Sequence, residues 1–385
     1  MPAVLILGAR APVALDHARR FARHGWKVCV ADSISCRGSG WSRAVQTALR
    51  IPAPRSEPRA FVDAICRAVS EHGIDLLLPN CEEVFYVSRY RSALPEQLAI
   101  AADRFDKLTV LHSKLEFLKL ATDCGAKVPE SCGVASLGEA REWAAGRAVV
   151  LKPEFSRFGV HVRIYPHGIP HTVPELGDRG RWVAQEFCAG DELCSYSVAV
   201  DGRLTAHVTY RPLYRLSRSS SFYFDPVRAP AIREFVERFV RKMQYTGQIS
   251  FDWIECEEGR FAVLECNPRA ISGVHLFGSS DALPAAFTGA AAAPVEPSDA
   301  GARMIAAVML TAGLARSLRE KRLEKWRSDF SRARDVLTEP GDSRPLPGNL
   351  ADMVSHAIRA GRRRCSVREA ATWDIEWDGE SLPEC

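Results

Sequence analysis

At 385 residues the chain is too long for one ordinary hydrophobic core, so we expect two or three domains. Its 46% hydrophobic and 25% charged residues are typical of a globular protein, and a net charge of +4 does not indicate nucleic acid as a partner. Twelve cysteines without a CxxC pair, and no apolar run of the roughly 18 residues that cross a bilayer, predict a cytoplasmic protein without disulfides, a zinc site or a membrane partner.

The first hundred residues alternate strand and helix signals. Short apolar runs predict buried parallel strands at 4–7, 28–31 and 75–78. Amphipathic stretches that end at glycines predict helices over 13–24 and 61–72. This order predicts an N-terminal α/β domain, residues 1–103, built on a doubly wound parallel sheet.

The next part of the chain, residues 104–289, mixes helices and strands and predicts an α+β core. Helices are expected over 113–123 and 231–243. Strands are expected at 149–152, 182–187, 195–200, 248–254 and 261–267.

The remaining part, residues 290–385, begins with an Ala/Pro-rich linker and is expected to be mainly helical. A proline-rich break falls at 340–347, and residues 372–377 predict a short strand. We expect this region to pack against the core or to form a homodimer.

The hairpin predicted over residues 248–267 concentrates the polar residues that suggest chemistry. With the turn centred on Glu258 and Gly259, Asp252 lies opposite Glu265 at roughly 4.5–5.5 Å between Cβ atoms, and Asn267 lies on the same face. Two carboxylates and an amide oxygen are ligands that magnesium prefers. The alternative is a pair of edge carboxylates in water, but apolar neighbours make two facing charges costly without a cation.

The string FDWIECEEGRFAVLECNPR resembles the magnesium signature of the ATP-grasp superfamily, an Asp on one strand and Glu-x-Asn-x-Arg on the next. The matching residues are Asp252, Glu265, Asn267 and Arg269. The resemblance implies a core of two α+β subdomains, preceded by the α/β domain of carboxylate–amine ligases. It also implies ATP and Mg²⁺ as cofactors.

Two lysines fit the phosphate end of such a nucleotide site. The resemblance implies that Lys152, at the end of a predicted strand, contacts the α- and β-phosphates, and that Lys114, expected to open a helix, is a second ATP contact. An ordinary surface lysine is the alternative for Lys114. The loop Ser156–Gly159 departs from the family pattern, because it has one glycine and a bulky aromatic where several glycines are usual.

The adenine end is expected after the strand at 182–187. The resemblance implies that Gln185, Glu186 and the backbone of Phe187 and Cys188 contact adenine. It also implies that Glu192 accepts the ribose hydroxyls.

The reaction implied by the resemblance begins when a carboxylate attacks the γ-phosphate of ATP. An amine then displaces phosphate from the acyl phosphate, so that ADP and phosphate are released. Arg269 would face the γ-phosphate or acyl phosphate, Lys152 would assist it, and no covalent enzyme intermediate is expected.

The substrate residues are less firmly indicated. Arg211 and Arg215 are expected to share a face, with Arg218 beside them, and could clamp a carboxylate; a charged edge strand is the alternative. His275 follows the signature, where family members often place substrate contacts. Glu83, with Glu82, follows the third strand and could hold an amine or simply begin a helix.

Two functions from other classes compete with the ligase. An NAD-dependent oxidoreductase would use Gly8 and Asp32, but the segment 8–12 has one glycine instead of three, and Arg10 would crowd a pyrophosphate. A non-catalytic nucleotide-binding regulatory module has no need of three metal ligands. Carboxylases of the same superfamily usually carry further domains, and no biotin-attachment motif is present.

Overall fold

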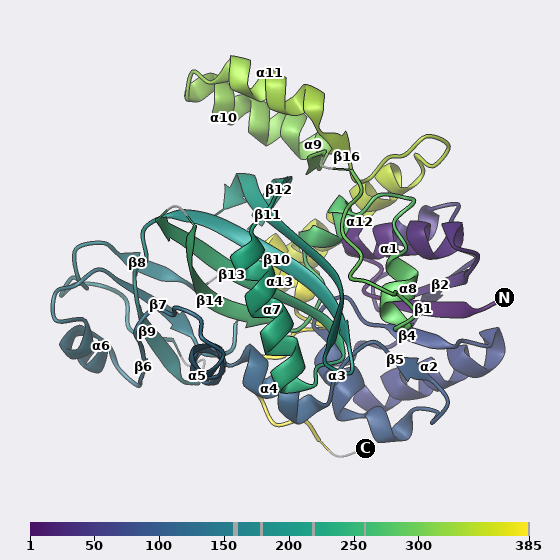
Figure 1. Cartoon of the computed structure of the whole chain (residues 1–385), viewed down its shortest axis with the longest axis horizontal. Helices are drawn as coiled ribbons and strands as arrows, with labels where there is room; N and C mark the ends of the chain where they lie inside the picture. Colours follow the sequence, from purple (N-terminus) through teal and green to yellow (C-terminus); the bar gives the residue numbers. More distant parts are fainter. Residues whose placement is uncertain (157–160, 178–179, 218–219, 258, 300, 384–385) are drawn as a thin grey trace.

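The computed structural model describes the chain except for residues 157–160, 178–179, 218–219, 258, 300 and 384–385. Its described residues form one parallel and two largely antiparallel sheets (Figure 1). The expected fold class is therefore confirmed, whereas the boundaries at residues 103 and 289 stay predictions. No helix in the described part of the chain combines the length and apolar character needed to cross a membrane.

The N-terminal sheet is parallel, with the strand order β3-β2-β1-β4-β5. Its strands are β1 (Ala3–Leu7), β2 (Lys27–Asp32), β3 (Thr47–Arg50), β4 (Leu76–Leu78) and β5 (Ala99–Ile100). Helices α1 (Pro12–Arg23), α2 (Pro58–His72) and α3 (Glu83–Arg89) connect them. The sequence did not predict β3 and β5, because β3 is half-exposed and β5 has only two residues.

The second sheet has four strands in the order β6-β9-β7-β8. They are β6 (Ser131–Val134), β7 (Val149–Pro153), β8 (Arg163–Tyr165) and β9 (Trp182–Glu186). Helix α6 (Leu137–Ala144) packs its Leu137 and Ala140 into the same apolar cluster as Leu151 and Trp182. The sheet places the end of β7, with Lys152, beside the third sheet.

The third sheet has the order β14-β13-β10-β11-β12-β15-β16. Its strands are β10 (Asp191–Val200), β11 (Arg203–Ser217), β12 (Ser220–Val227), β13 (Gly247–Glu257), β14 (Arg260–Asn267), β15 (Arg303–Met304) and β16 (Arg334–Asp335). Helices α5 (Glu116–Asp123) and α7 (Pro230–Met243) pack through Phe117 and Phe239 onto Phe251 of β13. One face of β13 is thereby buried, which leaves the other face for polar groups.

The helix expected over residues 113–123 is wrong at its start. A separate helix, α4 (Phe105–His112), ends before Ser113, and residues 113–115 form a turn into α5. The Ser113 hydroxyl oxygen accepts hydrogen bonds from the backbone N–H groups of Leu115 at 3.3 Å and Glu116 at 3.1 Å within this turn. Lys114 therefore lies in a turn, with its side chain free of the helix surface.

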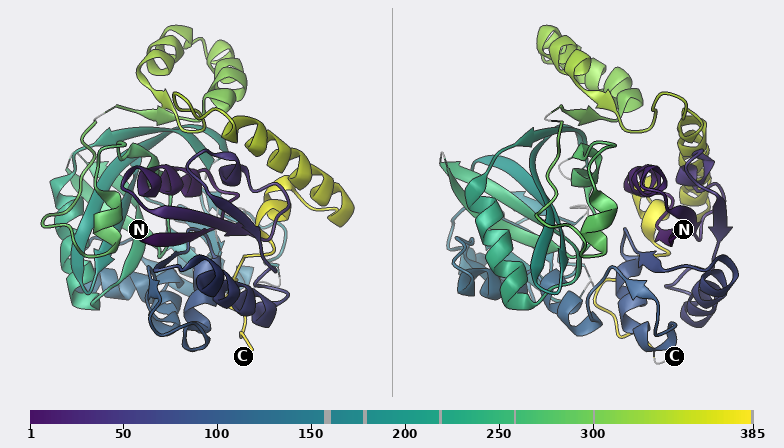
Figure 2. Two further views of the ribbon diagram at one scale, coloured as in Figure 1. Left: turned by 90° about the vertical axis from the view of Figure 1, so that its right-hand side faces the viewer. Right: turned by 45° about the vertical axis from the view of Figure 1, so that its right-hand side comes forward.

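The C-terminal region is mainly helical, as expected. It follows α8 (Leu283–Phe287) and contains α9 (Ala306–Val308), α10 (Leu314–Arg319), α11 (Leu323–Arg332), α12 (Pro345–Arg363) and α13 (Val367–Thr372). Helices α10 and α11 project beyond the third sheet, and the yellow segment after α13 runs along the N-terminal part (Figures 1 and 2). The strand expected at 372–377 is wrong: these residues leave α13 through a turn, because Asp374 and Trp377 bind other parts of the chain.

Candidate functional site

The hairpin of β13 and β14 places three oxygen-bearing side chains together. Asp252 pairs directly with Glu265, as predicted, and Asn267 pairs with Ser250 two residues further along. Asp252 and Glu265 are half-buried, and Asn267 is buried. No three His, Cys, Asp or Glu side chains gather as a metal site within the described residues, so a magnesium site here needs the Asn267 oxygen.

The two facing carboxylates titrate differently. Burial and the nearby charge of Glu265 raise the pKa of Asp252. Burial would also raise the pKa of Glu265, but the positive charges of Lys114 and Lys152 outweigh it and lower that pKa. A cation bound here would therefore stabilise the charged form of Asp252, and the oxygen donors around it fit magnesium.

Lys152 lies where the sequence placed it, at the end of β7. Its Nζ is 3.8 Å from Glu265 Oε2, and its side chain is 6% exposed. Burial lowers the pKa of Lys152, against the attraction of Glu265 and Asp252. A cation beside the predicted magnesium ligands could contact phosphate oxygens held by the same metal.

Lys114 approaches the same carboxylates from the α4–α5 turn. Its Nζ donates hydrogen bonds to the carbonyl oxygens of Glu154 (3.2 Å) and Ser156 (2.9 Å), just after β7. Burial lowers the pKa of Lys114 to about 8, although Glu265 opposes that shift. Lys114 is only 4% exposed, so a surface lysine is the wrong description of it. The rest of the loop, residues 157–160, lies outside the described residues.

Arg269 is the third cation of this group. Its Nη2 donates to Asn267 Oδ1 at 3.1 Å and is 3.8 Å from Glu82 Oε1. Its carbonyl oxygen accepts a hydrogen bond from the Ser250 hydroxyl at 2.9 Å. Lys114, Lys152 and Arg269 all lie near enough for their positive charges to lower the pKa of Glu265.

Of the two acids after β4, Glu82 faces Arg269 and Glu83 does not. The Oε1 atom of Glu83 accepts the backbone N–H groups of Asn80 and Cys81, both at 2.9 Å. This is the ordinary role of an acid at a helix start, and burial raises the pKa of Glu83. The sequence placed both acids at the ligand-binding edge of the sheet, but residue type alone could not tell them apart.

The predicted adenine residues lie at the end of β9. Gln185 is buried, and its Nε2 donates to the Ser131 hydroxyl at 3.1 Å. The backbone N–H groups of Glu186 and Phe187 donate to the carbonyls of Glu130 (2.8 Å) and Ala148 (3.2 Å). Because these two N–H groups already have partners, a backbone contact with adenine would need the carbonyl groups of Glu186 and Phe187 or the backbone of Cys188. Burial raises the pKa of the Cys188 thiol to about 11.

The two arginines expected to share a face bind carboxylates on opposite faces of the third sheet. Arg215 Nη2 lies 2.5 Å from Glu192 Oε2, and Arg211 Nη2 lies 2.8 Å from Glu255 Oε2. Glu192 shares a face with Asp252, because Cys194 of β10 pairs with Asp252 and strands alternate. Glu255 lies on the other face by the same alternation.

The expectation of a shared face fails because the alternation of β11 breaks between the two arginines. Tyr214, which lies just before Arg215, has a φ of 48°, in the left-handed region. Arg215 therefore lies on the carboxylate face and Arg211 does not. Arg218, also considered from the sequence, lies outside the described residues.

His275 has a buried partner in the N-terminal part. It lies in the 3-10 turn η3 (Ser272–Leu276), its Nδ1 hydrogen-bonds Asp16 of α1, and its ring stacks on Phe224 at 5.4 Å. Asp16 also pairs with Arg20 at 2.5 Å, and although burial opposes it, these two partners lower the Asp16 pKa. The structure thus gives His275 a buried hydrogen bond to α1, and its substrate role stays a prediction.

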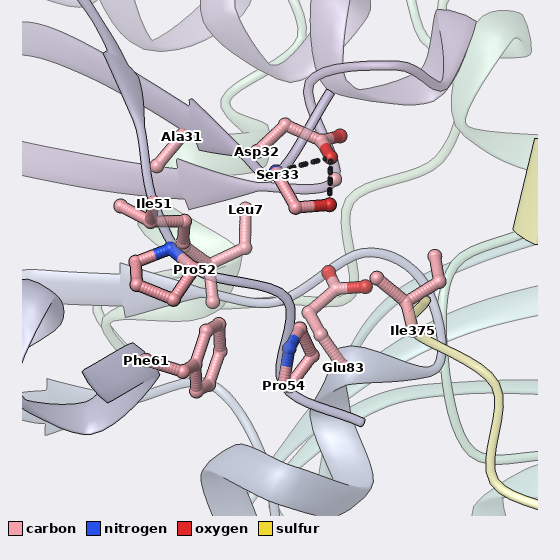
Figure 3. A pocket seen from close by; sticks show the side chains of 11 residues that line it. Leu7, Ala31, Asp32, Ser33, Ile51, Pro52, Pro54, Phe61, Glu83 and Ile375 are labelled. Carbon is pink, nitrogen blue, oxygen red and sulfur yellow. Dashed lines mark hydrogen bonds between the residues drawn. The ribbon is translucent and has the colours of Figure 1, made fainter. Parts of the chain in front are cut away.

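Arg10 occupies the place where a dinucleotide pyrophosphate would approach the first strand. Its Nη2 is 2.5 Å from Asp32, and its Nη1 is 2.6 Å from Asp374. A small cavity at the ends of β1 and β2, lined by Asp32, Phe61 and Glu83 among others, has room for about a single water molecule (Figure 3). An oxidoreductase site of the expected kind is therefore blocked.

Comparison with known proteins agrees with this geometry at the level of the fold. No family model matches the sequence, and no curated protein matches it. N5-carboxyaminoimidazole synthetase from Staphylococcus aureus, also solved with ADP, is 13% identical, with a TM-score of 0.61 over 83% of this chain and 86% of that chain. Phosphoribosylamine–glycine ligase from Thermotoga maritima is 17% identical, with a TM-score of 0.58 over 78% of this chain and 78% of that chain.

A third solved structure is similar over most of the chain. Biotin carboxylase from Campylobacter jejuni, solved as a β,γ-ATP complex, is 15% identical, with a TM-score of 0.59 over 75% of this chain and 70% of that chain. Likenesses at such low identity show the fold alone. They confirm the fold that the hairpin signature predicted.

Proposed function

We propose that this chain, which has the ATP-grasp fold, is an ATP- and magnesium-dependent ligase that joins a small carboxylate to an amine. The carboxylate attacks the γ-phosphate of ATP, and the amine, of amino-acid type, then displaces phosphate from the acyl phosphate. ADP and phosphate are the other products. The nucleotide complexes of the similar structures support ATP as the co-substrate.

The proposal depends on one observation: Asp252 and Glu265 face each other, and the charges of three cations act on Glu265. Charge builds on a transferring phosphoryl group, so a ligase of this kind needs fixed cations more than it needs a nucleophile. A module that only binds nucleotide has no need to bring Lys114, Lys152 and Arg269 to one pair of carboxylates.

Each side chain of this group has a role in the proposal. Asp252, Glu265 and Asn267 would hold magnesium, which would neutralise phosphate charge when bound. Lys114 and Lys152 would bind phosphate oxygens. Arg269 would face the transferring phosphoryl group, oriented by its hydrogen bond to Asn267 and its contact with Glu82.

The proposed adenosine contacts lie on neighbouring elements. Glu192 would accept hydrogen bonds from the ribose hydroxyls. Arg215, its ion-pair partner, would release Glu192 when nucleotide binds or would bind the substrate carboxylate. Gln185 and the segment Glu186–Cys188 would border adenine. We also propose that the protein is cytoplasmic and forms a homodimer.

The test is a screen for ADP release with MgATP over pooled carboxylates and amines. We expect release that depends on both pools, and we expect Glu265→Ala to abolish it. The matched control is Glu255→Ala, which removes a carboxylate from the opposite face of β13 and should leave the release intact. Turnover that survives Glu265→Ala would contradict the metal assignment, and ATP binding without ADP release from any pool would favour the regulatory module.

A further inference from the structure

The segment Asp374–Glu380 follows α13 and contacts both the N-terminal sheet and the loop after β7. At its start, Asp374 accepts hydrogen bonds from Arg10 (2.6 Å) and from the Ser33 hydroxyl (2.5 Å), both at the ends of N-terminal strands. Near its end, Arg55 holds the segment through Asp378 at 3.3 Å. Figure 2 shows this segment in yellow beside the purple and blue N-terminal part.

Trp377 anchors the middle of the segment in a cluster of rings. It is 3% exposed, and its ring lies within 4.8–6.3 Å, centroid to centroid, of four aromatic side chains. These are Phe85, Phe105, His112 and Phe155. Its indole N–H donates to the Glu380 carbonyl at 2.8 Å, so the side chain is fixed in orientation as well as in place.

One ring of this cluster, that of Phe155, lies between the two residues whose carbonyl groups bind Lys114. Phe155 lies 5.3 Å from Trp377, and it separates Glu154 and Ser156, whose carbonyl oxygens both accept hydrogen bonds from Lys114. A shift of Phe155 would therefore move both acceptors of the Lys114 ammonium. Gly379 touches the same ring from the segment, since an added Cβ would lie 2.5 Å from Phe155 Cδ2.

Trp377 also contacts the acid that faces Arg269. Its backbone N–H donates to Glu82 Oε2 at 3.3 Å, while the other oxygen of Glu82 lies 3.8 Å from Arg269. The same residue thus borders the acceptors of Lys114 and the partner of Arg269. Lys114 and Arg269 lie more than 150 residues apart in the chain, and the charges of both act on Glu265.

We infer that Trp377 is a positioning residue, which holds Phe155 and Glu82 in place and thereby orients Lys114 and Arg269 for the phosphates of ATP. The inference rests on the proposed function, because that function assigns both cations to ATP. It gives the C-terminal region a part in the site, although Trp377 lies more than a hundred residues beyond the signature. No contact between Trp377 and ATP itself is needed.

The experiment measures the dissociation constant for MgATP by calorimetry on the full chain. Trp377→Ala is expected to weaken MgATP binding about tenfold, which corresponds to about 1.4 kcal/mol. The measurement is made at a temperature at which circular dichroism shows the variant fully folded. A residue that only stabilises the fold would lower the unfolding midpoint and leave this constant unchanged.

Three further variants isolate the contact with Phe155. Trp377→Phe keeps an aromatic ring in the cluster and should restore binding to within about threefold of the wild type. Gly379→Ala keeps Trp377 but pushes on Phe155, because Gly379 has a φ of +89° and little space, and it should also weaken binding. Trp373→Ala is the matched control, since Trp373 is 39% exposed and lies under Arg363 at 3.6 Å.

Unchanged MgATP binding by folded Trp377→Ala overturns the inference. If Trp377→Ala does not fold, Gly379→Ala decides, and unchanged binding by that variant overturns the inference instead. Equal weakening by Trp373→Ala would also overturn it, because the effect would then not pass through Phe155. If the wild type and Trp373→Ala both fail to bind MgATP, the proposed function is wrong and the inference falls with it.

Discussion

Asp252 and Glu265 lie directly opposite one another because two bulges in the hairpin cancel. Between the turn and this pair, β13 has one extra residue, Cys256, and β14 has one extra residue, Leu264. A single extra residue would turn the following side chains to the other face. With one on each strand, both acids stay on the same face, and two like charges meet in a half-buried place.

Asp252→Asn should stabilise the protein and remove its response to magnesium. Because burial and Glu265 raise the pKa of Asp252, removing its charge relieves repulsion, by about 1 kcal/mol or roughly 2 °C in the unfolding midpoint. The measurement is thermal unfolding with and without Mg²⁺ and ADP. Glu255→Gln, on the opposite face, should keep the wild-type magnesium response. An Asp252→Asn variant with the full magnesium response would contradict the metal site.

MgATP binding should weaken above pH 8. Burial lowers the pKa of Lys114 to about 8, and the charged ammonium is the form that binds phosphate, so its charged fraction falls about tenfold per unit well above that pH. Calorimetry between pH 7 and 9.5 measures the effect. Lys114→Arg keeps its charge and should flatten the profile. Lys119→Ala, an exposed lysine of α5, is the control and should follow the wild type.

Lys152→Ala should weaken MgATP binding at least tenfold while the protein remains folded. Lys152 is buried beside Glu265, and its loss removes a positive charge from the phosphate site. Calorimetry gives the affinity, and circular dichroism shows whether the fold is kept. Affinity equal to that of the wild type would remove Lys152 from the site.

The two arginines of β11 should behave differently. Arg215→Ala removes the partner of Glu192 on the carboxylate face, and we expect at least a tenfold loss of substrate-dependent ADP release below saturation. Arg211→Ala breaks a partly exposed ion pair on the other face, and we expect a change of less than about 1 kcal/mol in unfolding free energy and none in release. Equal losses from both variants would contradict the assignment of faces.

The protein should lose stability as the pH falls from about 6.5. Burial lowers the pKa of His17 and of His207 to about 3, whereas unfolded histidine titrates near 6.5. Between these values the unfolded state binds protons that the folded state excludes, so stability is present above pH 6.5 and is lost below it. Each histidine lowers the free energy of unfolding by about 2 kcal/mol between pH 6.5 and pH 5.

Urea unfolding at pH 7 and pH 5 tests this prediction. His207 is hydrogen-bonded to Ser197 (2.9 Å) and Thr209 (3.2 Å), so His207→Gln keeps a polar partner for both. The variant should lose about 2 kcal/mol less than the wild type between the two pH values. Equal losses would show that His207 is protonated in the folded protein.

The sequence by itself determined the elements whose residues lie close together along the chain. Period-two alternation and a tight turn predicted Asp252 opposite Glu265, because a hairpin pairs residues that are near neighbours. The pairing agrees with that prediction because the two bulges, which the sequence did not predict, cancel. Buried apolar runs were enough to predict β1, β2 and β4 for the same reason. The position of Lys152 at the end of a strand also followed from its own neighbours.

The tertiary structure alone decided which distant groups meet. The left-handed Tyr214, which sends Arg211 and Arg215 to opposite faces, has no sequence signal, because tyrosine adopts this conformation only where surrounding contacts impose it. The choice of Glu82 over Glu83 depends on Arg269, far along the chain. Trp377 contacts Phe155 and Glu82, which lie far from it in the chain, and such contacts depend on how whole sheets and helices are placed rather than on local pattern.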